Sequence, residues 1–274
     1  MFNTTKTIYS MMLDNAREYG LKHVVLPNTT LNEKFDRQVV LPDDVPNPIT
    51  QYFCIGLNYD DILEDDTIDL DNVRHDVSHG ALFRHAPLIA RKATDQFTVD
   101  ELAKYRMRVT KRIGGEDYVF FMLKKIDSVF ESGKILHIPV EDGEGSVELF
   151  STIGSEILNP TPNTRDEILN SDLSYLKYSN TLQVSLNEEE KVELENACHI
   201  YYENDETIDL RELALVSGID YTYNGVLDAY NTQVMYFEKV DYLLDDNNLN
   251  VPFRHTMEIG GMSPMVYKTY TPTS

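Results

Sequence analysis

The sequence predicts an α+β fold dominated by antiparallel hairpins, with a few short helices and extended arms. The chain has 274 residues and is 42% hydrophobic, which is enough to bury a core despite its acidity. Strand-like runs recur between turn signals rich in Gly, Pro, Asp and Asn, whereas helix caps precede only short stretches. No repeat of 20 to 50 residues is visible, so a repeat architecture is not expected.

Capping residues mark the expected helices. The first spans 5–19, with Thr4 or Thr5 as its cap and Gly20 beyond its end. A helical turn starts at Thr98, because a glutamate follows three residues later. By the same pattern we expect further helices from residue 164, over 187–202 and over 209–217.

The clearest strand signal is a hairpin over 105–126 that turns at Gly114 and Gly115. A two-residue Gly-Gly loop favours the primed turns that match strand twist, and it fixes the pairing of the two strands. We therefore expect Arg112 to face Asp117, and the pairs Val109/Phe120 and Met107/Met122 to follow. Other strands are expected at 23–26, 52–57, 134–140, 146–153, 219–223 and 232–244.

Two stretches read as arms. Residues 27–51 and 245–274 are polar, punctuated by proline and poor in regular patterning, and we expect at least one of them to contact another subunit. The pattern changes near residue 160. This predicts an N-terminal α+β region, 1–160, which holds the basic hairpin, and a C-terminal α+β region, 161–274, with an extended tail.

Charge is distributed unevenly along the chain. The net charge is −22, yet residues 84–125 hold 10 of the 24 Lys and Arg and only 5 of the 46 Asp and Glu. On the hairpin, Arg106, Arg108 and Arg112 should project from one face, with Asp117 as the evident partner within the hairpin. We expect a neighbouring subunit to supply the missing carboxylates, which is a feature of a chain made to be assembled.

Composition argues against several classes of protein. An acidic chain lacks the basic footprint that nucleic acid and anionic membranes require, and no stretch of 18 apolar residues or signal peptide is present. We therefore expect synthesis in a reducing cytosol. Cys54 and Cys198 stand in no metal or redox spacing and are expected to be buried thiols. Because no phosphate-cradling or dinucleotide-binding glycine motif occurs, no cofactor is expected.

Three histidines cluster in the run RHDVSHGALFRH, namely His75, His79 and His85. Two histidines four residues apart on a helix could chelate a metal ion. Ser78 and Gly80 disfavour a helix here, however, and the glutamate of the metalloprotease motif is absent. A polar loop is the favoured interpretation, and a metal-dependent hydrolase that uses the three histidines is kept as an alternative. The chain carries no GxSxG nucleophile motif, and we do not expect an enzyme.

Two stretches resemble virion structural proteins of large tailed bacteriophages. One is HGALFRHAPLIARKATDQFTVDELAKYRMRVTKRIGGEDYVFFMLKKID, residues 79–127, which is similar to a segment where a Leu-Phe-Arg/Lys-His-x-Pro run precedes a capped turn and a glycine-turn hairpin. The other is LRELALVSGIDYTYNG, residues 210–225, which is similar to a strand–turn element of tail and baseplate components, with Ala214 where that element has Gly. The resemblance implies a non-enzymatic subunit of a tail, baseplate or neck, present in many copies, and it carries over no catalytic residues.

The expected function is therefore that of a virion structural subunit, synthesised in the host cytoplasm and incorporated into the particle. Its expected partners are other virion subunits, including copies of itself, with neither membrane nor nucleic acid. An acidic inhibitor that mimics nucleic acid and blocks a basic groove of a host protein remains a second alternative. The residues expected at the interface are Arg106, Arg108, Arg112, Met262, Pro264 and Tyr267.

Overall fold

The structure is a computed structural model that describes residues 4–58, 74–126, 134–138, 148–149, 175–205, 207–244 and 251–264. The chain divides into two compact units. One comprises residues 1–128 and 184–255, and the other comprises residues 129–183 and 256–274. The chain thus leaves the first unit and returns to it, whereas the sequence suggested one division at residue 160, which itself lies outside the described residues.

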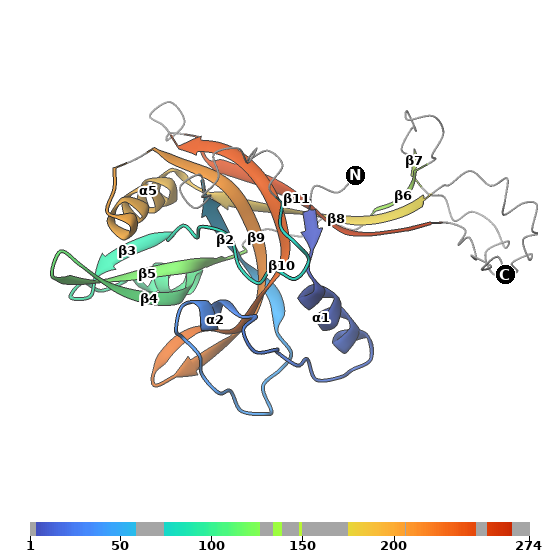
Figure 1. Ribbon diagram of the computed structural model, residues 1–274, viewed down its shortest axis with the longest axis horizontal. Helices are drawn as coiled ribbons and strands as arrows, with labels where there is room; N and C mark the ends of the chain where they lie inside the picture. The colour runs from blue at the N-terminus through green and yellow to red at the C-terminus, as the bar shows by residue number, and fades with distance from the viewer. Residues whose placement is uncertain are drawn as a thin grey trace, which may run out of the picture. The chain divides into compact units, whose positions relative to one another are not determined.

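A seven-stranded sheet forms the framework of the first unit (Figure 1). Its order is β1-β10-β9-β2-β5-β3, and β4 also pairs with β5. Each of the pairs in this sheet is antiparallel, which confirms the strand-dominated α+β class. The strands are β1 (Thr4–Lys6), β2 (Ile49–Leu57), β3 (Ile89–Lys92), β4 (Tyr105–Ile113), β5 (Glu116–Lys125), β9 (Ile208–Tyr223) and β10 (Val226–Leu244).

The β4–β5 hairpin has the predicted register. Arg112 faces Asp117 and Val109 faces Phe120, across a turn in which Gly114 and Gly115 have φ of 57° and 88°. Two consecutive positive φ angles are the mark of a type I′ turn, which glycine adopts without strain. Within β4, Met107 also has a positive φ of 61° although it carries a side chain.

A buried carboxylate holds this bend in β4. The amide of Met107 donates to Oδ1 of Asp228 at 2.5 Å, and the amide of Arg108 donates to Oδ2 of Asp228 at 3.0 Å. A positive φ at a residue with a side chain costs free energy, so it persists where surrounding contacts determine it. Asp228 of β10 thus fixes the backbone at the point where the basic hairpin begins.

Among the residues that the structure describes, the first unit has four helices, and three of them lie at or near predicted positions. They are α1 (Ile8–Glu18), α2 (Leu31–Lys34), α3 (Val99–Lys104) and α5 (Glu188–Tyr202). Thr98 and Asn187 open α3 and α5 with complete capping boxes. The cap of α1 is Thr7, whose side chain accepts from the amide of Ser10, whereas Thr4 and Thr5 belong to β1. The predicted cap was wrong because pairing with β10 draws those residues into the sheet.

Two other local predictions were wrong. Residues 209–217, predicted as a helix, belong to strand β9, and residues 23–26, predicted as a strand, lie in a loop. Every residue from Glu212 to Ile219 is buried. β9 pairs with β10 along one edge and with β2 along the other, and residues on both of its faces are buried; this pairing and burial outweigh the helix preference of the run LRELALV.

A second sheet of four strands has the order β11-β8-β6-β7. Its strands are β6 (Lys134–Ile138), β7 (Glu148–Leu149), β8 (Tyr175–Leu186) and β11 (Phe253–Pro264). Strands β6 and β7 fall within the predicted ranges. Part of the predicted C-terminal arm is thus strand β11, and the helix predicted from residue 164 lies outside the described residues.

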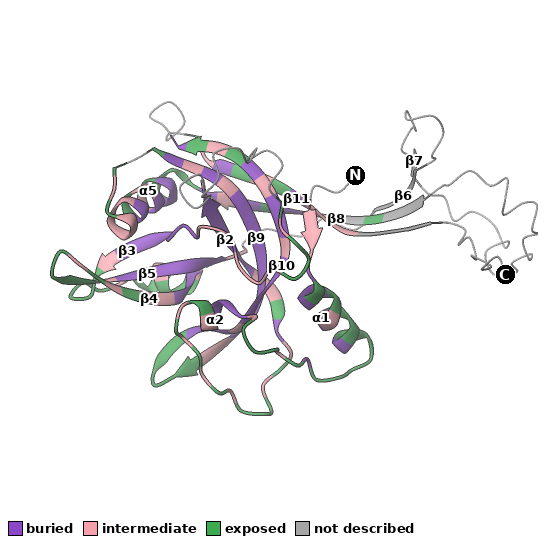
Figure 2. Cartoon of the chain, viewed as in Figure 1, coloured by how far each residue is buried: buried purple, intermediate pink, exposed green. Residues whose placement is uncertain are grey.

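The core of the first unit runs through the middle strands of its sheet (Figure 2). Tyr52 of β2, Phe120 of β5 and Val216 of β9 are fully buried in it. Cys54 and Cys198 are buried free thiols, as predicted, and burial raises the pKa of each well above its usual value. In the described part of the chain, no helix is both long enough and apolar enough to cross a membrane.

Candidate functional site

Residues 84–125, which we call the basic block, form ion pairs with acids of the same chain. Arg106 is only 2% exposed. Its Nε donates to Oδ1 of Asp220 at 2.7 Å, its Nη2 donates to Oδ2 at 3.1 Å, and its Nη1 donates to the carbonyl of Leu102 at 2.6 Å. The expectation that Arg106 forms part of an exposed interface ridge was therefore wrong. Its charge is satisfied by a carboxylate 114 positions away on β9.

Asp220 contacts two cationic side chains and one tyrosine hydroxyl. Besides Arg106, it accepts from the hydroxyl of Tyr52 at 2.6 Å and pairs with Nζ of Lys125 at 2.5 Å. Partial burial alone would raise the pKa of Asp220, but hydrogen bonds from Arg106, Lys125 and Tyr52 outweigh it and lower this pKa to about 2. Asp220 therefore stays ionised and ties β2, β4, β5 and β9 together.

Helix α5 neutralises more of the basic block. Arg91 pairs with Glu193 of α5 at 2.6 Å and with Glu101 at 2.6 Å. Lys124 pairs with Glu190 of α5 at 2.7 Å, and its side chain is 3% exposed. The acids at the start of α5 thus face the cations of β3 and β5. The charge asymmetry of the sequence is satisfied to a large degree inside the first unit.

The other predicted interface residues differ in their surroundings. Arg112 is exposed opposite Asp117, so its role at an interface stays a prediction. The guanidinium of Arg108 lies over the rings of Phe97 and Phe121, at 5.8 and 6.0 Å from their centres. Met262 and Pro264 belong to the end of β11, where side chains are not described, and Tyr267 lies outside the described residues.

Two of the three clustered histidines, His75 and His79, contact each other. His75 also contacts Glu212, a pairing that the sequence did not predict. Nδ1 of His75 lies 3.1 Å from Nδ1 of His79, and Nε2 of His75 lies 2.5 Å from Oε1 of Glu212 on β9. His85 stands apart, since its Nε2 accepts from the amide of Leu82 at 3.1 Å. Burial, followed by the charges of Lys34 and His75, lowers the pKa of His85 to about 3.

The three histidines therefore do not converge on one point. Among the residues that the structure describes, no group of three or more His, Cys, Asp or Glu is arranged to hold a metal ion. His75 and His79 offer two ring nitrogens, and the other nitrogen of His75 is engaged by Glu212. The arrangement is that of a hydrogen-bonded chain of titratable groups.

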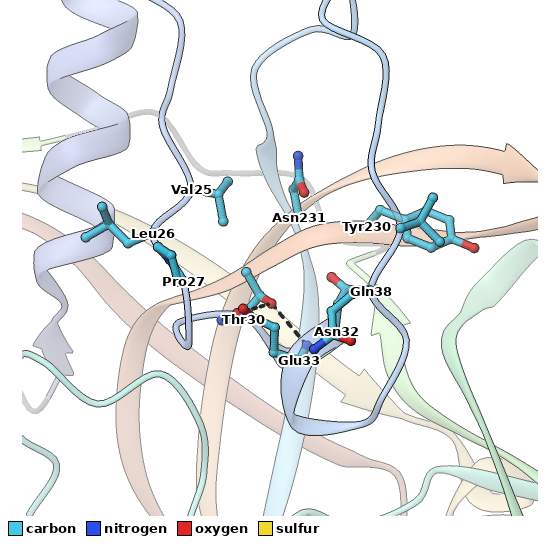
Figure 3. A pocket seen from close by; sticks show the side chains of 10 residues that line it. Val25, Leu26, Pro27, Thr30, Asn32, Glu33, Gln38, Tyr230 and Asn231 are labelled. Atoms are coloured by element: carbon cyan, nitrogen blue, oxygen red, sulfur yellow. Dashed lines mark hydrogen bonds between the residues drawn. The ribbon is translucent and has the colours of Figure 1, made fainter.

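A pocket of about 270 Å³ lies beside α2 (Figure 3). Glu33 at its edge is committed to capping, because its carboxylate accepts from the amides of Asn28, Thr29 and Thr30 and from the hydroxyl of Thr30. The bond from the Asn28 amide contributes most to lowering the pKa of Glu33. The pocket is lined by Val25, Leu26, Pro27, Thr30, Asn32, Glu33, Gln38, Val39, Tyr230 and Asn231.

Exposed apolar side chains gather in the N-terminal part of the chain. In the described residues, 18 large hydrophobic side chains are exposed, and eight of them fall within residues 8–49. Val40 is the extreme case, at 97% exposure. We call these eight the N-terminal surface: Ile8, Met11, Tyr19, Leu21, Val24, Leu26, Val40 and Ile49.

Helix α1 contributes to this surface because it is apolar on more than one face. Tyr9, Leu13 and Ala16 are buried, and the first two pack against Met235 of β10. Ile8 and Met11 point elsewhere and are 41% and 47% exposed. These two side chains lie outside the buried apolar stripe of the helix and add to its exposed apolar area.

Hydrogen bonds hold the loops of the N-terminal surface in place. The amide of Leu21 donates to the carbonyl of Ala16 at 2.7 Å, and the side-chain amide of Asn47 donates to the carbonyl of Leu21 at 2.8 Å. The guanidinium of Arg17 donates to the carbonyl of Pro48 at 2.6 Å. The segment after α1 is thus tied to the segment before β2, and little ordering is needed for either to bind a partner.

The segment that carries the N-terminal surface is close to neutral. Residues 4–49 carry five Lys and Arg and six Asp and Glu, although the whole chain has a net charge of −22. Most of the negative charge therefore lies elsewhere in the chain. The surface combines exposed apolar area, fixed loops and low net charge, which together suit contact with another protein.

A family model matches residues 2–273, and it is described as a family of unknown function, DUF7208. No curated protein and no solved structure matches the chain.

Proposed function

The chain belongs to DUF7208, a family of unknown function, and on that premise we propose a role from its own residues. It is a non-enzymatic structural subunit of a tailed-bacteriophage virion, and it assembles in several copies. Copies meet through the N-terminal surface, and the assembled subunits reside in the tail, baseplate or neck of the particle. The occupant of the surface is thus a second copy of this chain.

The N-terminal surface is the observation that carries this proposal. Two copies that each bear −22 repel one another, and the repulsion is weakest where the local net charge is near zero. Residues 4–49 are such a place, and they also expose eight large apolar side chains. Burying that apolar area is favourable by roughly 25 cal/mol per Å² before the cost of association is subtracted.

The two stretches that resemble phage virion proteins lie next to one another in the fold. Residues 79–127 include β5, and residues 210–225 include most of β9. Both strands pair with β2, so the two stretches flank the same central strand. Their likeness thus concerns the framework of the first unit.

The salt dependence of assembly distinguishes this proposal from one driven by the basic block. A contact between opposite charges weakens as salt rises. A contact between apolar surfaces of two acidic copies becomes tighter, because salt screens their repulsion. Since Arg106, Arg91 and Lys124 are paired within the chain, we expect the second behaviour.

Sedimentation velocity of the purified full chain at increasing concentration tests self-association. We expect oligomers that become tighter between about 0.05 and 0.5 M salt. Val24→Glu should weaken association about tenfold or more, as the loss of an interface anchor does. Val99→Glu is the matched control, since Val99 is 83% exposed on α3 and is not part of the N-terminal surface, and it should change nothing. A wild-type chain that stays monomeric at every salt concentration contradicts the proposal.

Placement in a virion is tested by mass spectrometry of purified particles whose genome encodes this chain. The chain should be present in stoichiometric, multiple copies that remain after washing in high salt. Its recovery instead with a host DNA-binding enzyme, in a complex that salt dissolves, would contradict the structural role and favour an acidic inhibitor.

A further inference from the structure

Glu212 and His75 form a pair shielded from solvent. The side chain of His75 is 8% exposed and that of Glu212 is 5% exposed, with Nε2 and Oε1 at 2.5 Å. The second oxygen of Glu212 accepts from the amide of Phe83 at 3.0 Å. Both carboxylate oxygens thus bind the segment 74–83, a loop that lies across β9.

Aromatic rings fix the plane of the His75 imidazole. Its ring stacks on Phe237 of β10, with centroids 3.7 Å apart and planes at 5°. Phe83 stacks against it at 4.4 Å and 16°. The stacking holds the plane of the His75 ring, and within that plane its two nitrogens are directed at Glu212 and at His79.

The contacts assign the protons of this chain of groups. Nε2 of His75 carries a proton, because it faces a carboxylate. Nδ1 of His79 accepts from the amide of Asp76 at 3.2 Å and so presents a lone pair. The 3.1 Å contact between the two Nδ1 atoms then requires a proton on His75. In this closed arrangement both nitrogens of His75 donate, one to Glu212 and one to Nδ1 of His79, and Nδ1 of His79 carries no proton.

The same segment holds the start of α1. The amide of Ile8 donates to the carbonyl of Val77 at 2.8 Å, and the hydroxyl of Tyr9 donates to the carbonyl of Ser78 at 2.5 Å. Ile8 belongs to the N-terminal surface, and Tyr9 anchors α1 on its buried side. A change in residues 74–83 therefore reaches the helix through which copies are proposed to meet.

We propose that His75, His79 and Glu212 form a pH-sensitive clasp, in which the gain of a second proton by the histidine pair releases residues 74–83 and the start of α1. The clasp is closed when the two histidines together carry one proton more than two neutral imidazoles do. A second proton places an N–H of His79 against the N–H of His75 at 3.1 Å, and the two must separate. The consequence for assembly rests on the proposed function, whereas the opening itself does not.

Other charged and titratable groups around the clasp set its surroundings. Lys34 of α2 donates to the carbonyl of Leu82 at 3.5 Å, and its charge interacts with Glu212. Asp76 on the solvent side bonds the amide and hydroxyl of Ser78, and these bonds lower the pKa of its carboxyl. Cys54 and His85 are fully buried, and both stay uncharged in the range where histidines titrate.

The sign of the pH dependence follows from proton counting. Histidines titrate between about pH 5 and 8. In the lower part of that range the open segment binds one proton more than the closed segment, so closure weakens as pH falls, by about tenfold in its equilibrium constant per pH unit. At the upper end the shared proton is lost, and closure weakens again. The clasp is thus tightest at an intermediate pH.

Hydrogen exchange measured by mass spectrometry tests the clasp in the monomer, at a concentration below that of association. After correction for intrinsic exchange rates, protection of residues 74–83 and 8–11 should fall together by tenfold or more between pH 7 and pH 5 in the wild type. His79→Asn places an amide oxygen near the position of Nδ1 but cannot take the second proton. Its protection should change by less than about twofold over the same interval.

Two further variants complete the experiment. Glu212→Gln removes the charge that holds the imidazolium, so segment 74–83 should lose about 10- to 100-fold in protection at pH 7. His199→Asn on α5 is the matched control and should keep the wild-type acid response. Protection of 74–83 that is independent of pH in the wild type, or an unaltered acid response in His79→Asn, overturns the clasp. Opening of 74–83 without any change at 8–11 overturns its link to α1.

Failure of the clasp and failure of self-association are separate results. Association measured at pH 7 tests the N-terminal surface, and exchange of the monomer tests the clasp. If copies associate at pH 7 and release at pH 5 in the wild type but not in His79→Asn, regulation of assembly by the clasp is supported. Equal release in both proteins contradicts it.

Discussion

Replacing Arg106 by methionine should lower the free energy of unfolding by about 3 kcal/mol. Methionine has a similar length and no charge, so the cavity is small and the loss is mainly that of the buried ion pair. The variant removes two hydrogen bonds to Asp220 and the bond to the carbonyl of Leu102. It leaves a carboxylate in place without its bidentate partner.

The magnitude comes from the surroundings of Asp220. Breaking a buried ion pair by removing one partner costs about 3–5 kcal/mol. Asp220 keeps Lys125 and Tyr52 as partners, and its side chain is 25% exposed, so the lower end of that range applies. For a protein of this size, about 3 kcal/mol corresponds to a fall in Tm of roughly 6–12 °C.

Thermal and urea unfolding of the purified variants measure this loss. Arg112→Met is the matched control, because Arg112 is exposed on the same strand and an exposed pair contributes about 0–1 kcal/mol. Equal stability of the two variants would refute the reasoning, since it would place Arg106 among exposed charges. An Arg106→Met variant that is as stable as the wild type would also refute it.

Three further perturbations test Asp220 and two other contacts of the first unit. The pKa of Asp220 is lowered from 3.8 to about 2, so its ionised form adds about 2 kcal/mol to the free energy of unfolding above about pH 4. This stabilisation is lost as pH falls towards 2. The stability of Asp220→Asn, measured by acid unfolding, should lack this loss. Gly218→Ala places a Cβ 2.9 Å from Thr232 and 3.0 Å from Tyr52, which should cost about 1–3 kcal/mol in urea unfolding, and an unaltered midpoint would disprove that packing. Thr98→Ala removes the cap of α3 and should cost about 1 kcal/mol by the same assay, whereas a stabilised variant would exclude the capping role.

Local features of the fold could be predicted from the sequence. The β4–β5 hairpin and the capping boxes of α3 and α5 depend on residues a few positions apart, and their chemistry is visible in a short run. The helix predicted over residues 209–217 was wrong, because these residues form a strand that pairs with β2 on one edge and β10 on the other. Periodicity within a segment does not show whether both of its faces will be covered.

The candidate site was less predictable than the fold. The sequence predicted that a neighbouring subunit supplies carboxylates to the exposed arginines, but Arg106 pairs with Asp220 of the same chain. The partners of Arg106 and His75 lie 114 and 137 positions away, on β9. A chain with 46 acids offers too many candidates for sequence spacing to choose among. The exposed side of α1 could have been noticed, since Ile8 and Met11, like Tyr19 just beyond the helix, fall outside the spacing of the buried Tyr9 and Leu13.

The most direct test of assembly through the N-terminal surface is photocrosslinking from single positions. A photoreactive amino acid placed at Val24, which is 63% exposed, should yield covalent dimers and larger species in the assembled protein, with crosslinked peptides from residues 8–49 of another copy. The same group at Val99, in the basic block, should yield monomers. Crosslinks between copies from Val99 and none from Val24 would contradict the account and return the interface to the basic block.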